Sequence, residues 1–434
     1  MSKRSFVIGT TAAVVTAVSF VGIQIANPSW AGFRSSPKEV VDEVWQIVNR
    51  EYVDATFNQT DWESKRRDLL DRDYASDEQA YDAIREALED LDDPYTRFLD
   101  PKQYASMQID TSGELTGVGI TLSANEENER LTVVSPVEGS PAFKAGIQAR
   151  DIITAIDGTS TEGMDINSAV NLIRGEEGTV VKLSILREET GEELDFDITR
   201  ARIELQAVRH EMRDEGGYQV GYVRLTQFSG NAAEGMRAAV KELETDGVDG
   251  YILDLRSNPG GLLYSSAEIA RMFLREGGIV STINRKGIPD KISANRRSLT
   301  DKPLVVLVDG GSASASEILS GALQDNNRAI IVGTQTFGKG LVQQVHSLSG
   351  GAGLAVTIAR YRTPNGTDID KKGILPDIEI EMTDADIERL SNDRELVATP
   401  DDPQYATALK ALTRRMAGES RSQIISSSLT PAVN

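Results

Sequence analysis

The chain has 434 residues, a formal net charge of −21 and no cysteine. At about 150 residues for each domain, this length predicts two or three domains. The acidic composition has no electrostatic footprint for nucleic acid and indicates surface solubility instead. The absence of cysteine excludes thiol catalysis and disulfide bonds. With only two histidines there is no cluster of zinc ligands, so neither a metal site nor a cofactor is expected.

The first 31 residues have the composition of an export signal. Lys3 and Arg4 precede an apolar run from Phe6 to Ala26, and small residues, Ser29 and Ala31, stand at the two positions that direct signal cleavage. The sequence therefore predicts an exported protein. The apolar run is also just long enough to span a bilayer, so an uncleaved, membrane-associated anchor is the alternative.

Residues 36–110 are predicted to form a helical N-terminal region. Apolar residues recur there at helical spacing, first at Val40, Val41, Val44, Ile47 and Val48, and then at Ala83, Ile84, Ala87, Leu88 and Leu91. Asp93-Pro94 ends the second stripe, because the residue before a proline disfavours the helical conformation. Such stripes are typical of a packed core, so we expect this region to be an arm or cap.

Residues 113–200 change to short strands separated by turns and resemble a PDZ domain. The stretch GSPAFKAGIQARDIITAIDG, residues 139–158, matches the helix, turn and strand of that module. Within it, Ala149-Arg150-Asp151 replaces the more usual Pro-Gly-Asp turn. The departure affects a local turn and leaves the peptide groove in place.

The PDZ resemblance implies which residues bind a peptide. The loop of Gly117, Val118, Gly119 and Ile120 would capture a terminal carboxylate through its backbone amides, and the following strand would pair with the peptide. Arg174 occupies a position that the resemblance links to the sensing of bound substrate. A surface arginine before a turn is the alternative for that residue.

Residues 201–381 alternate between hydrophobic runs typical of strands and helical patterns. Helices are predicted at about 232–244, at about 263–273 and after Ser314. This alternation favours a layered α/β core. Residues 382–434 contain one predicted helix, near 405–416, and a Ser-rich end that is expected to be a mobile tail.

A candidate serine nucleophile and a candidate lysine base stand in GSASASEI, residues 311–318, and TFGKGLVQQ, residues 336–344. A helix over 316–324 carries the chain roughly 13 Å away from Ser314, and a strand over 329–334 returns it by roughly 20 Å. The loop with Lys339 therefore arrives beside the serine. A serine hydroxyl needs a base to take its proton, and a buried lysine with a lowered pKa is a recognised one.

Three other interpretations of these motifs stay open. His210 or His346 could be the base, although neither lies in a glycine-rich setting. The small residues and paired glycines could be turn formers alone. The stretch from Gly333 to Lys339 matches most of a phosphate-binding loop, but Gly340 stands where that loop needs Ser or Thr for magnesium, which disfavours an NTPase.

Taken together, the motifs resemble those of the C-terminal processing peptidases, also called tail-specific proteases. SASASEI, Asp325, TFGKG followed by VQ, and DLRSNPGG at residues 254–261 stand in the order and spacing of that family, and the similarity extends from about residue 36 to about residue 380. The resemblance implies an α/β fold with a crotonase-like core, also seen in the caseinolytic protease family, and an inserted PDZ domain. In such a chain the core is residues 201–381.

The same resemblance implies a role for each site residue. Ser314 is then the nucleophile, Lys339 the general base, and Gln343, one helical turn past the lysine, the residue that orients the base. The backbone N–H groups of Gly260 and Ala315 would form the oxyanion hole. Glu317 and Asp325 have supporting positions.

The implied function is that of an exported serine endopeptidase that collects free, apolar C-termini with its PDZ domain and cleaves near them. Relatives in photosynthetic organisms trim the precursor of a photosystem II subunit, so membrane-protein precursors are candidate substrates. The periplasm or the thylakoid lumen is then the expected location. The rival is a catalytically silent PDZ scaffold, against which the joint presence of Ser314 and Lys339 argues.

Overall fold

The computed structural model describes residues 36–124 and 130–428. They divide into two compact units: one combines the chain up to Thr111 with the chain from Ala207 onward, and the other is Ser112–Gln206. The predicted export signal, residues 1–31, lies outside the described residues. Within the described ranges, no helix has the length and apolar character needed to cross a membrane.

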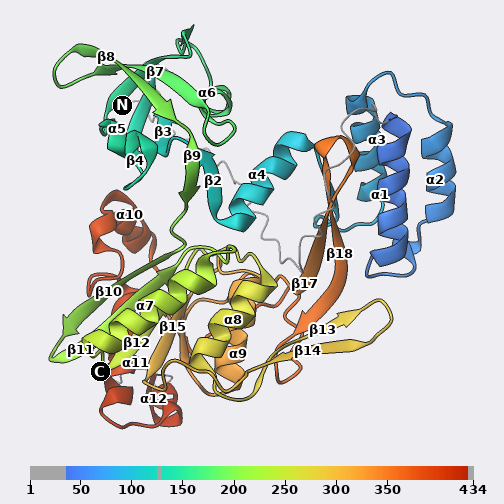
Figure 1. Cartoon of the computed structure of the whole chain (residues 1–434). Helices are drawn as coiled ribbons and strands as arrows, with labels where there is room; N and C mark the ends of the chain where they lie inside the picture. The colour runs from blue at the N-terminus through green and yellow to red at the C-terminus, as the bar shows by residue number, and fades with distance from the viewer. Residues whose placement is uncertain (1–35, 125–129, 429–434) are drawn as a thin grey trace, which may run out of the picture. The chain divides into compact units, whose positions relative to one another are not determined.

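A six-stranded sheet forms the centre of the larger unit (Figure 1). Its first two strands are antiparallel and the remaining neighbours are parallel. The runs GYILD and LVVLV are buried along their whole length, as expected for parallel strands covered on both faces. In sheet order the strands are β10 (Val208–Glu215), β11 (Tyr218–Leu225), β12 (Gly250–Asp254), β15 (Leu304–Val308), β16 (Ile330–Gly333) and β19 (Ile378–Glu379).

Helices cover both faces of this sheet. Successive side chains of a strand point to opposite faces, so Tyr251 and Leu253 join one core and Ile252 joins the other. The first core is completed by α7 (Ala232–Asp246), α8 (Leu263–Phe273) and α9 (Ala315–Asp325), and the second by α11 (Pro403–Met416). Because β12 and β15 are parallel, the loops that follow them leave the sheet at the same edge, and Ala313 N–H donates to Asn258 O across these loops.

A second, antiparallel sheet joins the N-terminal region to the core. Its strand order is β1-β18-β13-β14, with β17 paired to β18, and the N-terminal helices share a separate apolar core with Leu348, Leu354 and Val356. The strands are β1 (Arg97–Leu99), β13 (Gly278–Asn284), β14 (Pro289–Ser293), β17 (Leu341–Ser347) and β18 (Gly353–Arg362). The helices are α1 (Pro37–Glu51), α2 (Trp62–Asp71), α3 (Asp77–Glu89) and α4 (Pro101–Ser112), with the 3₁₀ turn η1 (Phe57–Gln59) between α1 and α2.

The unit Ser112–Gln206 has a sheet of its own, in the order β3-β4-β5-β7-β8, with β6 paired to β5. Two helices accompany it, α5 (Pro141–Ala145), which begins at the N-cap Ser140 and ends at Gly146, and α6 (Ile166–Ile173). The strands are β2 (Glu114–Gly117), β3 (Ile120–Ala124), β4 (Leu131–Pro136), β5 (Asp151–Ile156), β6 (Thr159–Ser160), β7 (Val180–Arg187), β8 (Glu192–Thr199) and β9 (Ala201–Glu204), of which β2 and β9 pair separately. In this order β3 is an edge strand.

The C-terminal segment differs from the prediction of a mobile Ser-rich tail. After α10 (Asp384–Asn392) and α11, residues Arg421–Ser428 form a further helix, α12. Ile424 on that helix is buried, and Arg421 Nη2 lies 2.6 Å from Asp377 Oδ1. One apolar anchor and one ion pair therefore hold a segment whose serine content alone indicated mobility. Residues 429–434 lie outside the described part of the chain.

Candidate functional site

Ser314 lies at the turn between β15 and α9, where it is the N-cap residue of the helix. Its backbone has φ 55° and ψ −110°, and its side chain is fully buried. A residue other than glycine in such a conformation costs about 1–3 kcal/mol and persists where the surroundings fix it. A strained strand-to-helix turn also carries the serine of the α/β-hydrolases.

Glu317 joins the serine loop to the lysine loop. Its Oε2 accepts hydrogen bonds from Ser314 N–H at 2.7 Å and from Lys339 N–H at 2.9 Å. Its Oε1 accepts from Thr336 Oγ1 at 2.6 Å and from Gly338 N–H at 2.7 Å. Burial raises the pKa of this carboxyl, and the four hydrogen bonds oppose that rise. The structure thus brings the backbones of Ser314 and Lys339 to one oxygen atom.

Tyr361 on β18 makes a second bridge between the same two residues. Its hydroxyl donates toward Ser314 O at 3.1 Å and also contacts Lys339 O. Burial raises the pKa of this phenol far above its usual value, so the hydroxyl keeps its proton. Glu317 and Tyr361 together fix the relative position of the two loops.

Lys339 is buried with its side-chain amine close to the aromatic ring of Tyr95. The exposed fraction of the residue is 1%, and within the described residues its Nζ has no hydrogen-bond partner. Burial, together with the charge of Arg97, lowers the pKa of this lysine to about 7 against the opposing effects of Asp93 and Glu317. A large fraction of the side chain is therefore uncharged near neutral pH.

Gln343 is buried but does not lie on a helix. The prediction that Gln343 lies one helical turn past Lys339 is wrong, because Gln343 belongs to strand β17, next to a β-bulge between Val342 and Gln343. Its Nε2 donates to Thr357 Oγ1 at 3.2 Å, and its Oε1 has no hydrogen-bond partner in the described part of the chain. The helical spacing was implied by the family resemblance, whereas pairing with β18 makes this segment a strand.

Gly260 closely approaches the serine. Its φ is +103°, and a Cβ at this position would lie 2.9 Å from Ser314 Cβ and 3.0 Å from Ala315 N, so only glycine fits. The Gly260 N–H donates to Asn258 Oδ1 at 2.9 Å. Ala315 is the first residue of α9, and an N–H group at that position has no acceptor within its own helix.

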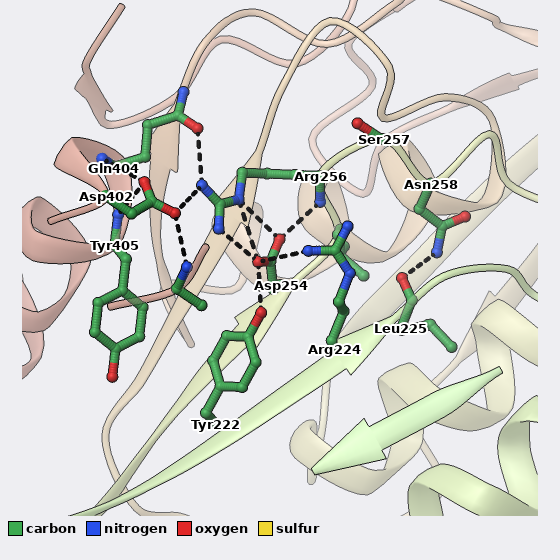
Figure 2. A network of polar contacts seen from close by, with 12 residues as sticks. Tyr222, Arg224, Leu225, Asp254, Arg256, Ser257, Asn258, Asp402, Gln404 and Tyr405 are labelled. Carbon is green, nitrogen blue, oxygen red and sulfur yellow. Dashed lines mark hydrogen bonds and ion pairs between the residues drawn. The ribbon is translucent and has the colours of Figure 1, made fainter. Parts of the chain in front are cut away.

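Asn258 organises the loop that carries Gly260. Its amide nitrogen donates to Leu225 O at 2.8 Å, and its backbone oxygen accepts from Ser316 Oγ at 2.9 Å. Figure 2 shows the side chain of Asn258 directed at Leu225. The loop is thereby tied both to β11 and to α9.

A buried ionic network holds the start of the same loop (Figure 2). Asp254, at the end of β12, accepts from Arg256 Nη2 at 2.7 Å and from the Tyr222 hydroxyl at 2.8 Å. Arg256 Nη1 also donates to Asp402 Oδ2 at 2.8 Å. The charge of Arg256 holds the pKa of the Asp254 carboxyl below its usual value despite burial. Because Asp402 is the N-cap of α11, the network links the loop to the C-terminal helix.

Several other candidates lie apart from Ser314. Asp325 is at the opposite end of α9, where it accepts from Asn365 N–H at 2.8 Å. His346 Nε2 lies 2.8 Å from Glu51 Oε2, and His210 Nε2 lies 3.2 Å from Glu242 Oε2, so each histidine is engaged by a glutamate. Among the described residues there is no group of three or more metal-binding side chains.

The geometry also disfavours a phosphate-binding loop at 333–339. Such a loop leads into a helix, whose N-terminal amides hold the phosphate. Here the loop leads into strand β17, and the amides of Gly338 and Lys339 bind the Glu317 carboxylate.

In the unit Ser112–Gln206, the predicted peptide-binding loop joins β2 to the edge strand β3. Gly119 has φ +79°, and a Cβ there would lie 2.4 Å from Ser140 Cβ. Val118 is buried, and its carbonyl accepts from Ala142 N–H, which ties the loop to α5. Arg174 is the C-cap of α6, and its Cγ lies 4.0 Å from where a Cβ on Gly117 would stand. The loop and the arginine are therefore neighbours.

Comparison with known proteins decides the family. Residues 219–380 match peptidase family S41, and residues 132–187 match the PDZ domain. A carboxyl-terminal-processing protease of Synechocystis sp. is 45% identical over 388 residues, which cover 89% of this chain and 89% of that protein. The chain belongs to the carboxyl-terminal-processing proteases of family S41.

Other relatives agree with this family. The chloroplastic carboxyl-terminal-processing peptidase 2 of Arabidopsis thaliana is 38% identical over 377 residues, covering 84% of this chain and 72% of that protein. Among solved structures, a photosystem II D1 C-terminal processing protease is similar with a TM-score of 0.54 and 37% identity, covering 86% of this chain and 100% of that chain. This carboxyl-terminal-processing protease is thus a serine-type peptidase with a mixed α/β fold and a PDZ domain, which confirms the family and enzyme class predicted from the motifs.

The motifs did not single out Tyr95 and Tyr361, which contact Lys339. They also did not single out Asn258, which accepts from Gly260 N–H, or Arg256, which holds the start of the same loop. Asn258 and Arg256 stand inside the quoted motif DLRSNPGG, so the motif itself was the available signal. Tyr95 and Tyr361 stand in segments far from Ser314 and Lys339 in the chain, one near Asp93-Pro94 and one in β18. Only the tertiary contacts identify them.

Proposed function

We propose that this processing protease cleaves its substrates with Ser314 as nucleophile, Lys339 as general base and Gln343 as the residue that orients the base. The observation that carries the proposal is the buried Lys339 amine, whose pKa is lowered to about 7 and whose backbone shares the Glu317 carboxylate with Ser314. A lysine that is mostly neutral at working pH accepts a proton without first losing one. The unpaired Gln343 Oε1, among the described residues, is an acceptor suited to the resulting ammonium.

In the proposed reaction, Ser314 Oγ attacks the scissile carbonyl carbon as its proton passes to Lys339 Nζ. The carbonyl oxygen becomes an oxyanion, stabilised by the Ala315 N–H at the start of α9. Gly260 is the second proposed donor; because its N–H donates to Asn258 Oδ1, it must share that hydrogen or rotate its peptide. The ammonium of Lys339 then protonates the departing amine. Water attacks the acyl-enzyme with Lys339 again as base, releasing the new C-terminus.

We further propose that the PDZ unit collects the free, apolar C-termini of protein substrates. The edge strand β3 offers an unpaired side for an added peptide strand, and the loop from Gly117 to Ile120 leads into it. The name of the similar photosystem II D1 protease points to precursors of membrane proteins as substrates. The cyanobacterial and chloroplastic relatives favour the periplasm or the thylakoid lumen as the location.

The layered sheet with α9 at the carboxyl ends of its parallel strands supports assignment of the core to the crotonase-like class. Asp325, near the far end of α9, then has a role in helix and loop stability, whereas Glu317 supports the site itself.

The test uses a fluorescent peptide with a free C-terminus and the variants Ser314→Ala and Lys339→Ala. Both variants should fold and lose turnover by several orders of magnitude, and the double variant should be no worse than either, because residues that act as a unit are not additive. Ser320→Ala is the matched control, since Ser320 is equally buried on α9 and its hydroxyl donates to Ser316 O and Glu317 O of the same helix. Retained turnover in either single variant would contradict the assignment, and binding without cleavage by the wild type would favour a silent scaffold.

A further inference from the structure

The turn between α3 and β1, residues 93–97, reaches the base side of the site. The Tyr95 ring faces the Lys339 amine, with Nζ 4.4 Å from the ring centroid. The turn is held by Asp93, whose carboxylate accepts from Tyr95 N–H at 3.0 Å and from Thr96 Oγ1 at 2.7 Å. Beyond it, Arg97 begins strand β1 and pairs with Ala355 of β18. Tyr95 is therefore presented to the lysine by a fixed backbone.

The next residue of the turn reaches Gln343 through one intermediate. Thr96 Oγ1 accepts from Thr357 N–H at 3.0 Å, and Thr357 Oγ1 accepts from Gln343 Nε2 at 3.2 Å. Thr96, Gln343 and Thr357 are all buried. Since Nε2 is engaged by Thr357, the orientation of the Gln343 amide is set from this side and its Oε1 is left for the lysine.

The charged groups around Lys339 act in opposite directions. Arg97, on the same turn, disfavours the ammonium form, while Asp93 and Glu317 favour it. The electron-rich face of Tyr95 also favours an ammonium. Asp370 and the protonated Tyr361 complete the set of ionisable groups near this cluster. The turn thus carries both an attractive and a repulsive element for the protonated base.

We propose that Tyr95 and Thr96 are positioning residues for the general base: Tyr95 holds the Lys339 amine in one place, and Thr96 orients Gln343 through Thr357. This inference rests on the proposed function and extends it to the N-terminal helical region, to which no part of the chemistry is otherwise assigned. It explains why a segment so distant in sequence is packed against the catalytic loops. Both residues act through Lys339 or Gln343 and make no proposed contact with the substrate.

The experiment measures kcat/KM as a function of pH for variants of the full-length enzyme. Tyr95→Leu removes the ring and should move the acidic limb of the profile to lower pH by roughly half a unit, with a several-fold lower kcat. Tyr95→Phe keeps the ring and should leave the limb in place.

A third variant tests the link to Gln343. Thr96→Val should lower kcat with little change in KM, and Thr96→Ser should restore it because the hydroxyl is retained. Thermal melting of each variant reports folding separately. An unchanged acidic limb in Tyr95→Leu, or an unchanged kcat in Thr96→Val, would overturn the inference, and if one of these two variants does not fold the other still decides. Activity that survives Ser314→Ala or Lys339→Ala would instead refute the proposed function.

Discussion

At the scale of single residues, the burial of Lys339 lowers the stability of the folded protein, although the proposed reaction needs this lysine. The pKa of this lysine is lowered from 10.5 to about 7 by burial. Above pH 10.5 the side chain is neutral in the folded and the unfolded chain. As the pH falls toward 7, the unfolded chain binds a proton that the folded protein does not bind, so unfolding is favoured progressively. Below about pH 7 the loss of unfolding free energy no longer changes with pH.

We therefore expect Lys339→Met to be inactive and more stable than the wild type. The gain in unfolding free energy should be roughly 3–5 kcal/mol at pH 7, at about 1.4 kcal/mol for each unit of pKa shift, and should shrink toward pH 10. Urea denaturation at pH 7 and pH 9.5 measures it. The exposed Lys410→Met is the matched control and should change little at either pH. A gain independent of pH would show that packing, and not protonation, is responsible.

Arg150 is a single residue at which the PDZ unit departs from the usual Pro-Gly-Asp turn, as the sequence already indicated. It replaces glycine in the usual turn, and it has φ +71°, a left-handed conformation that favours glycine. Arg150→Gly should raise the stability of the unit by about 1 kcal/mol. Thermal denaturation checks this, with Lys144→Gly on α5 as a control that should lower stability by a similar amount. A lower melting temperature for Arg150→Gly would mean that the arginine side chain makes compensating contacts.

At the scale of elements, the start of α11 is part of the support of the Gly260 loop. Asp402 caps that helix through Gln404 N–H and Tyr405 N–H and also pairs with the buried Arg256. Removal of one partner leaves a buried charge without compensation. The C-terminal helix thereby acts on the site from the opposite face of the sheet.

Asp402→Ala should lower the free energy of unfolding by about 3–5 kcal/mol and reduce kcat, because the loop before Gly260 loses one of its supports. The neighbouring Asp401→Ala is the control, since that side chain is exposed and lies outside the network. Chemical denaturation and turnover of the same peptide give the two readouts. Equal effects of the two substitutions would show that neither the helix cap nor the ion pair with Arg256 stabilises the protein.

At the scale of the whole molecule, recognition and cleavage are assigned to different compact units. If the PDZ unit reads the terminal carboxylate, a peptide acid should be cleaved roughly tenfold to a hundredfold more efficiently than the same peptide as an amide at sub-saturating concentration. This follows from one charge-assisted hydrogen bond of about 1.5–3 kcal/mol, at tenfold for each 1.4 kcal/mol.

The loop variant Gly119→Ala should abolish that preference, because its Cβ would lie 2.4 Å from Ser140 Cβ. Gly139→Ala is a close control, with φ +73° and no atom within 4 Å of the added Cβ. Initial rates for the acid and amide peptides provide the comparison. Equal cleavage of both peptides by the wild type would remove C-terminal recognition from the PDZ unit.

Local patterns in the sequence were sufficient to predict several structural elements and the enzyme family of this protein. Helical spacing predicted the helix at 263–273, and the motifs around Ser314 and Lys339 predicted the enzyme family that the relatives confirm. These features depend on residues that are close in the chain or on motifs whose chemistry requires particular residue types. The return of the lysine loop to Ser314 also followed from the lengths of one helix and one strand.

Tertiary structure alone decided the remainder. Gln343 lies on a strand because β18 pairs with it, α12 forms because Ile424 and Arg421 find partners on the core, and Tyr95 meets Lys339 because β1 joins the same sheet. Each of these depends on contacts between segments far apart in sequence. Periodicity and propensity describe a segment by itself, whereas burial, hydrogen-bond partners and the pKa of a buried lysine are properties of what surrounds it in space.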